Sequence, residues 1–210
     1  MINAQTLKDI LKVLKDIADH GATAVMLLKQ IHENTSQPPA VPIQDVREPI
    51  QVSEPELIEV SGMAAPWVAS GLEWDGKSEV ADEAKLTDFL GFNPNGKTGG
   101  MSWCAGFWLA IFQSLGFDVD GLDRSVLSFS NFGYDLLEKY DAQSLPNGAI
   151  LVFQPDPDGE FPISHVGVKV DDDKLFGGNQ GDKVKRSNLA WYLQHAKLVA
   201  ARCPDGYKLV

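Results

Sequence analysis

The order of the apolar segments between residues 61 and 210 constrains the fold more than any other feature of this sequence. Helical patterns come first: PWVASGLEW, then VADEAKLTDFLGF ending near Gly91, then the strongly apolar SWCAGFWLAIFQSLG, which Gly116 closes. Strand patterns follow in AILVFQ, ISHVGVKV and LFGGNQ, separated by the turn signals LPNG and DDDK. NFGYDLLEKY is a predicted helix between the two groups, and the tail from Trp191 is predicted to add one or two strands. Helices followed by an antiparallel set of strands predict an α+β fold.

Two different segments precede this region. Residues 1–34 have apolar residues at helical spacing and predict a helical segment, which either packs on the main domain or serves in self-association or delivery. Residues 35–60 contain five prolines and no glycine, which favours an extended acidic linker, part of which can lie along the domain as an edge strand. The predicted boundary of the main domain is therefore Ser61, and that domain spans residues 61–210.

Charge and composition exclude several classes of function. The net charge of -11 argues against nucleic acid as a partner, because phosphate binding needs a basic face. The N-terminus lacks the uninterrupted apolar stretch of a signal peptide, and no run is long enough to span a membrane. We therefore expect synthesis in the cytoplasm without export by the general route. The two cysteines exclude a paired-cysteine zinc site, and the sequence predicts neither a metal nor another cofactor.

Cys104 lies where a helix can make a thiol reactive. Gly99 and Gly100 precede it, and Ser102 is the predicted N-cap of a helix that starts at Trp103. In the first helical turn, free backbone N–H groups and the positive end of the helix dipole favour a thiolate and can stabilise an oxyanion. The alternative is a cysteine that acts as a small buried hydrophobe, and position alone does not separate the two. Cys203, in a polar tail, is predicted to be structural.

His165 supplies the second chemical group. In ISHVGVKV the valines point one way and His165 the other, so the histidine can face a cleft. A Cys-His pair needs a third group that fixes the imidazole ring. Asn179, predicted to lie on the next strand, can do so through its amide oxygen. Gln180 ranks second, because in a regular strand its side chain points to the opposite face.

Four short motifs in this order carry a resemblance to a known family. WCAGF at a helix start, PNGAILVF, SHVG and GGNQ together resemble the CHAP and NlpC-type cysteine amidases and peptidases, especially a small phage-associated branch. The resemblance covers about residues 64–190 and does not reach the predicted helical segment or linker. It implies a papain-like fold, with helices packed on a small antiparallel sheet, and a Cys-His-polar triad that acts on peptidoglycan peptide.

The resemblance also implies roles for single residues. Cys104 would be the nucleophile, His165 the general base and acid, and Asn179 the orienting residue, with Gln180 the alternative for the third role. Glu73, Trp103 and Gln180 would bind substrate, although Glu73 can equally be a solvated helix-end acid and Trp103 a packing residue. Many relatives carry a glutamate two residues before the asparagine, where this chain has Gly177, which gives the imidazolium less electrostatic support.

The function expected from these features is cleavage of an amide bond of the cell-wall peptide, as an endopeptidase or an N-acetylmuramoyl-L-alanine amidase. A phage lysin released through a pore, a virion component or an injected toxin would each reach the wall without a signal peptide. Two alternatives stay open: a non-catalytic virion or binding module with the same fold, and a papain-like protease or deamidase that acts on a protein substrate.

Overall fold

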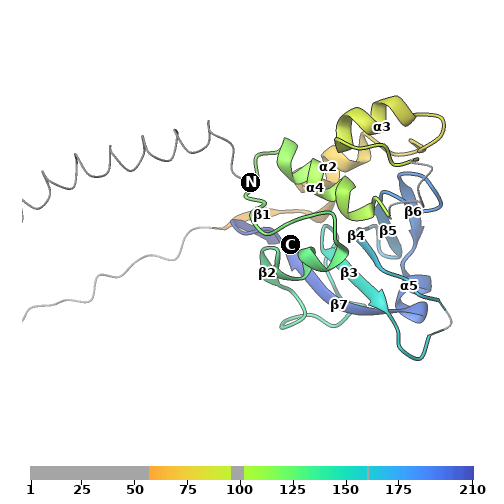
Figure 1. Cartoon of the computed structure of the whole chain (residues 1–210). Coiled ribbons are helices and arrows are strands. Elements are labelled where there is room, and N and C mark those ends of the chain that lie inside the picture. Colours follow the sequence, from red (N-terminus) through yellow and green to blue (C-terminus); the bar gives the residue numbers. More distant parts are fainter. Residues whose placement is uncertain (1–56, 96–101, 160) are drawn as a thin grey trace, which may run out of the picture. The chain divides into compact units, whose positions relative to one another are not determined.

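The structure, a computed structural model, describes residues 57–95, 102–159 and 161–210, which belong to one compact unit. The predicted helical segment 1–34 and the linker up to residue 56 lie outside the described residues. The described part is α+β, with helices on a mostly antiparallel sheet (Figure 1). Its elements are β1 (Ile58–Val60), η1 (Gly62–Ala64), α2 (Pro66–Leu72), α3 (Glu83–Leu90), α4 (Cys104–Ser114), η2 (Val126–Asn131), β2 (Tyr134–Asp135), β3 (Ile150–Pro155), β4 (His165–Val170), β5 (Lys174–Gly177), β6 (Lys185–Asn188), α5 (Leu189–His195), β7 (Ala196–Cys203) and β8 (Tyr207–Leu209).

The main sheet has six strands in the order β2-β7-β3-β4-β5-β6, and every neighbouring pair is antiparallel. All six residues of β4, near the middle, are buried. A separate two-stranded parallel sheet joins β1 to β8. Ile58–Val60, at the end of the predicted linker, is therefore paired with the C-terminal strand of the domain.

The helices α2, α3 and α4 confirm the three helices predicted before the strands. Helix α4 is buried over most of its circumference, as expected for a helix whose residues are apolar on all sides. It packs against β4 and β5, with α2 and α3 on its other sides (Figure 1). Gly91 ends α3 in a left-handed conformation, as the sequence predicted. This arrangement places Trp103, which precedes the first residue of α4, against Gly178 in the segment after β5.

Two segments differ from the sequence prediction. NFGYDLLEKY is not a helix: η2 ends at Asn131, Gly133 takes a positive φ, and Tyr134–Asp135 pairs with β7 as strand β2. The tail contains the helix α5 before its two strands β7 and β8. Asn188 starts α5, because its Oδ1 accepts a hydrogen bond from the Trp191 N–H at 3.2 Å. Among the helices of the described ranges, none has the length and apolarity needed to cross a membrane.

Candidate active site

Cys104 is the first residue of α4 and is fully buried. The N-cap position belongs to Trp103 and not to Ser102 as predicted, and no side chain caps the helix. The Ser102 hydroxyl instead lies 3.2 Å from Cys104 Sγ. The backbone N–H groups of the first turn have no partner within the helix, since there is no earlier turn to supply carbonyl groups. The thiol thus sits beside both unpaired backbone donors and a hydroxyl group.

His165 is the first residue of β4, and 5% of its surface is exposed. The predicted alternation, with the histidine facing an open cleft, does not describe its surroundings, because both faces of β4 are covered. Its imidazole lies between two side chains from later in the chain. The ring of Tyr192 stacks on it, with centroids 5.1 Å apart and planes inclined by 23°. The amide of Gln180 lies 3.2 Å from its Nε2. The histidine is therefore fixed in position by α5 on one side and by the segment after β5 on the other.

The side-chain amide of Gln180 has hydrogen-bond partners at both its oxygen and its nitrogen. With Oε1 facing His165, this oxygen accepts from Nε2 at 3.2 Å, and the Gln180 amide nitrogen donates to the Lys185 carbonyl at 2.7 Å and to Ser187 Oγ at 2.8 Å. This orientation satisfies both ends of a side chain that is only 3% exposed. In it Nε2 of His165 carries the proton, so Nδ1 has the free lone pair of a neutral imidazole.

Asn179 makes a different contact from the one predicted. Its Nδ2 donates to Ser102 Oγ at 3.3 Å, the same hydroxyl that contacts Cys104. The reason is local: β5 ends at Gly177, and Asn179 has a φ of 58°, in the left-handed region. The regular strand expected through GGNQ would have turned Asn179 toward the histidine. Because the strand ends earlier, Gln180 occupies that position.

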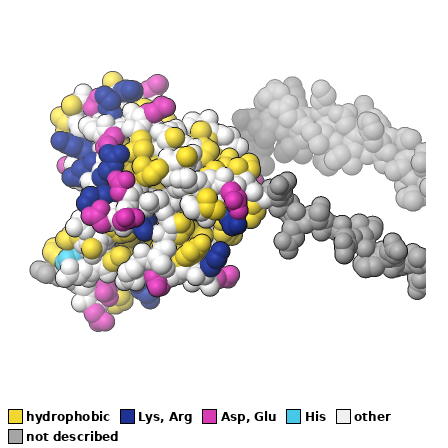
Figure 2. Space-filling model, turned by 180° about the vertical axis from the view of Figure 1, so that it is seen from behind, with side chains coloured by type: hydrophobic (Ala, Val, Ile, Leu, Met, Phe, Trp, Pro, Cys, Tyr) yellow, Lys and Arg dark blue, Asp and Glu magenta, His cyan; other side chains and the backbone are white. Residues whose placement is uncertain are grey.

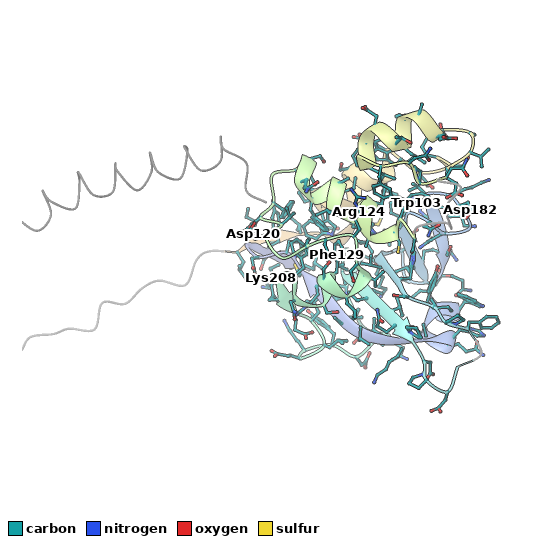
Figure 3. The ribbon with its side chains drawn as sticks, viewed as in Figure 1. Trp103, Asp120, Arg124, Phe129, Asp182 and Lys208 are labelled. Carbon is teal, nitrogen blue, oxygen red and sulfur yellow. The ribbon has the colours of Figure 1, made fainter. Side chains whose placement is uncertain are left out.

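The segment that carries these two amides packs directly on the start of α4. A Cβ added to Gly178 would lie 2.5 Å from the ring of Trp103 and 2.8 Å from Phe107 Cβ. Figure 3 labels Trp103 at the start of α4 and Asp182 in the connection between β5 and β6. This close contact brings the Asn179–Gln180 pair between the residue that begins α4 and the one that begins β4.

Tyr192 is a site residue that the sequence analysis missed. It stacks on His165, and burial first, then the charge of Cys104, raise the pKa of Tyr192 to about 12. The only local signal for this residue was Asn188, whose side chain can cap a helix. Recognising that cap would have predicted the helix α5 in place of a strand.

Burial lowers the pKa of His165 from 6.5 to about 4, because the low-dielectric interior disfavours the imidazolium. No carboxylate at position 177, two residues before Asn179, offsets this effect. Gly177 stands there, and a Cβ on it would lie 3.1 Å from Trp108 Nε1 and 3.4 Å from the Val166 carbonyl oxygen. A glutamate at this position would need the surrounding core to move.

This pKa predicts a pH dependence of stability. Between pH 6.5 and about pH 4 the unfolded chain binds a proton at residue 165 that the folded chain does not, so stability falls as the pH falls through this range. The expected loss is about 3 kcal/mol, since the pKa falls from 6.5 to about 4 and one pKa unit corresponds to about 1.36 kcal/mol. Urea unfolding at neutral pH and near the lower limit measures it. The loss should be smaller by that amount in His165→Asn, and equal losses in both proteins would contradict the assignment.

The remaining predicted site residues lie elsewhere. Trp103 is 1% exposed and donates from Nε1 to Glu79 Oε2 at 2.8 Å, so it supports α4 from within the core and presents no surface to a substrate. Glu73 is exposed at the end of α2. The described contacts do not connect it to Cys104, His165 or Gln180, and it does not line either pocket described below.

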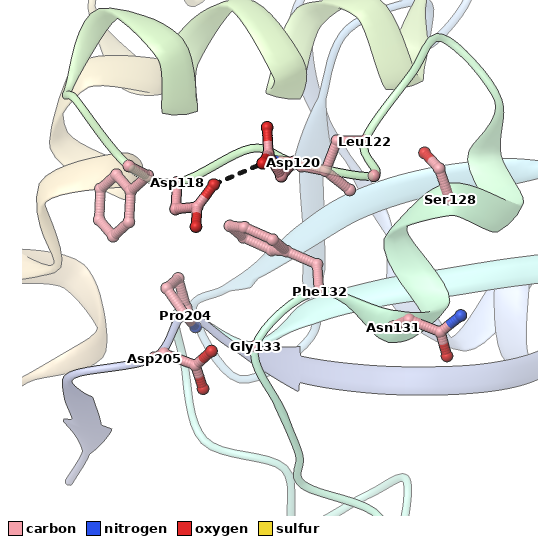
Figure 4. A pocket seen from close by; sticks show the side chains of 11 residues that line it. Asp118, Asp120, Leu122, Ser128, Asn131, Phe132, Gly133, Pro204 and Asp205 are labelled. Atoms are coloured by element: carbon pink, nitrogen blue, oxygen red, sulfur yellow. Dashed lines mark hydrogen bonds between the residues drawn. The ribbon is translucent and has the colours of Figure 1, made fainter. Parts of the chain in front are cut away.

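Two pockets differ in what they can do chemically. One, of about 430 Å³, lies beside the site and includes Gln180 and Tyr192, which contact His165. The other, of about 370 Å³, is lined by Asp118, Asp120 and Asp205 around Phe132 (Figure 4). Its lining has neither a nucleophile of the cysteine type nor a histidine. The residue types that acyl transfer needs are a cysteine and a histidine, and they stand at Cys104, which begins α4, and at His165, which Gln180 holds.

Comparisons with known proteins give distant structural likenesses. No family model matches the chain, and no curated protein matches it. Among solved structures the chain is similar to NlpC2 from Trichomonas vaginalis, at 20% identity and a TM-score of 0.36, over 61% of this chain and 47% of that one. It is similar to NlpC1 from the same organism at 22% identity and a TM-score of 0.34, over 61% of this chain and 45% of that one. It is also similar to a Staphylococcus aureus subsp. aureus Mu50 protein described as similar to lipoprotein, NLP/P60 family, at 13% identity and a TM-score of 0.43, over 72% of this chain and 45% of that one. The chain spans less than half the length of each of these proteins.

Proposed function

We propose that this chain is a cysteine hydrolase that cuts an amide bond in the peptide part of bacterial peptidoglycan. The observation that carries the proposal is the pair of consecutive amides Asn179 and Gln180: Asn179 contacts Ser102, which lies beside Cys104, and Gln180 holds Nε2 of the buried His165 ring. Cys104 is the nucleophile and His165 the general base and acid. Gln180 takes the positioning role that we first expected for Asn179.

The reaction is acyl transfer in two halves. Nδ1 of His165 takes the thiol proton as Cys104 Sγ attacks the carbonyl carbon, and the resulting tetrahedral intermediate carries a negative oxygen. The same imidazole then protonates the nitrogen of the breaking amide bond, so that the amine leaves and a thioester remains. Water, deprotonated by His165, attacks the thioester and releases the acid, and the proton returns to the thiolate.

Two groups next to Cys104 favour the charged species on this path. The N–H groups of the first turn of α4 are oriented toward an oxyanion formed at the sulfur-bearing end of the helix. The Ser102 hydroxyl accepts from Asn179 and so is free to donate its own hydrogen to Cys104 Sγ at 3.2 Å. In this role Asn179 acts on the nucleophile through Ser102, and Gln180 acts on the base directly.

The substrate class rests on the motifs WCAGF, PNGAILVF, SHVG and GGNQ, which resemble wall-cutting amidases and peptidases of the CHAP and NlpC type. Within that class the bond is either the sugar-to-alanine amide or a bond within the stem peptide or its cross-bridge. A phage-associated lysin, a virion component or an injected toxin are the settings proposed for this activity.

The test is digestion of purified peptidoglycan, followed by mass spectrometry of the soluble products. A new amino terminus on a muropeptide fragment identifies endopeptidase cleavage, and sugar chains freed of peptide identify amidase cleavage. If the folded chain releases neither product, the proposal is wrong, and a binding module or an enzyme acting on a protein substrate replaces it.

The positioning role gives a prediction that separates the two neighbouring amides. Gln180→Ala is expected to lower kcat at least about tenfold, because the imidazole loses the partner that sets its tautomer. Asn179→Ala should cost less, since its contact is with Ser102. The pH profile provides the second measurement: in Gln180→Glu the carboxylate stabilises the imidazolium, so the acidic limb of kcat/KM should move to higher pH. A larger loss in Asn179→Ala, with an unmoved acidic limb in Gln180→Glu, would return the third role to Asn179.

A further inference from the structure

The pocket of about 430 Å³ lies next to residues that contact His165. Two of its lining residues, Gln180 and Tyr192, are the ones that hold the imidazole. In the proposed reaction this imidazole protonates the leaving nitrogen, so the leaving half of the substrate must lie on the side of the histidine. The pocket therefore lies where the leaving half would be bound.

The lining of this pocket contains one cation, Lys185. Its ammonium group lies over Gly181, since a Cβ added to that glycine would be 3.2 Å from Lys185 Nζ. The other basic residue on the same strand, Arg186, is paired with Asp75 and Asp171, and Lys77 nearby is paired with Asp82. Among the ion pairs of the described residues, none involves Lys185.

The remainder of the lining suits an organic acid rather than a bare anion. Trp191 is 42% exposed and forms an apolar wall next to polar Asn188. Figure 2 shows Lys and Arg side chains interspersed with Asp and Glu side chains on the side of the molecule that carries α3 and β6. A carboxylate on an aliphatic residue would meet a cation and an apolar surface together, and such a pair is stronger than either contact alone.

We propose that this pocket binds the leaving half of the substrate and that Lys185 pairs with a carboxylate group on the leaving residue. The inference rests on the proposed function and narrows its substrate: the preferred amide has, on its amine side, a residue with a free carboxylate near the scissile bond. A leaving residue whose carboxylate is amidated would lose the ion pair and keep the apolar contact.

The experiment uses two synthetic wall peptides that differ only in whether the leaving residue carries a free carboxylate or a carboxamide. The wild type is expected to show a kcat/KM about tenfold higher for the free carboxylate, as one charge-assisted contact implies. Lys185→Glu should abolish or reverse this preference, and Lys185→Arg should keep it. Lys183→Glu is the matched control, because Lys183 is exposed two residues away and does not line the pocket.

Binding of the same two peptides to Cys104→Ala separates this inference from the proposed function. Tighter binding of the free carboxylate that disappears in Lys185→Glu supports the pocket, even if the wild type cuts neither peptide, in which case the proposed reaction is wrong. Cleavage or binding that does not distinguish the two peptides, or an equal change in Lys183→Glu and Lys185→Glu, overturns the assignment of Lys185.

Discussion

Cys104→Ala is expected to lower the rate of peptidoglycan cleavage by at least about a thousandfold, because the covalent half of the reaction loses its nucleophile. The loss should appear in kcat, since the groups that line the neighbouring pocket are unchanged. Amine release from purified peptidoglycan measures it, and circular dichroism shows whether the variant keeps its fold. Residual activity within tenfold of wild type would exclude Cys104 as nucleophile.

The second cysteine supplies the matched control for this experiment. Cys203 is also fully buried and also free, and burial raises the pKa of its thiol above the ordinary value. It lies at the end of β7, where its Sγ approaches the Tyr207 carbonyl at 3.6 Å. Cys203 lies in a strand, away from any helix start, and its raised pKa keeps the thiol neutral, so Cys203→Ala should keep most of the activity. A comparable loss in both variants would point to a general effect on the fold.

Gly133→Ala is expected to destabilise the domain by more than about 4 kcal/mol, the largest effect on stability that we predict for a single methyl group. Gly133 has a φ of 63°, and an added Cβ would lie 2.0 Å from the carbonyl oxygen of Cys203. The backbone of β7 at Cys203 would have to move away. Because Cys203 also pairs with Tyr134, this movement would disturb the pairing of β7 with β2. Urea unfolding measures the effect, and a variant that does not accumulate as folded protein also meets the expectation.

Gly91 separates the contribution of the backbone conformation from that of the steric clash. It has a similar φ of 71°, but an added Cβ would have nothing within 4 Å. Gly91→Ala should therefore lower the free energy of unfolding by only about 1 to 2 kcal/mol, which is the cost of placing an alanine in a left-handed conformation. Equal losses in the two variants would mean that the carbonyl of Cys203 yields easily, and the clash argument would be wrong.

The parts of the fold that could be predicted from the sequence are those set by local patterns. Helix α4 and strands β3 and β4 follow from apolar runs and from the turn residues around them. The placement of Cys104 at a helix start follows in the same way. His165 was found by its surroundings, although its burial on both faces of β4 depends on α4 and α5 and could not be read from alternation alone.

The predictions that were wrong depend on contacts distant in the sequence. NFGYDLLEKY has helical spacing, but Gly133 fits closely against Cys203, and the next two residues pair with β7. Tyr192 contacts His165 because α5 follows β6, and this contact joins residues distant in the sequence. The order of Asn179 and Gln180 was decided by one backbone angle, a φ of 58° at Asn179, which no side-chain pattern encodes.

The left-handed backbone at Asn179 also limits which insertions and deletions the site can tolerate. Asn179 and Gln180 are consecutive, and Asn179 reaches Ser102 beside Cys104 while Gln180 reaches His165. The residues that contact Ser102 and His165 are therefore joined by a single peptide bond, and their spacing cannot change without loss of one contact. Asparagine suits the position because it tolerates a left-handed backbone and carries an amide. An insertion or deletion here would separate the two groups without disturbing the core, whereas the exposed turn Asp171–Asp173 between β4 and β5 can change in length at little cost to the chemistry.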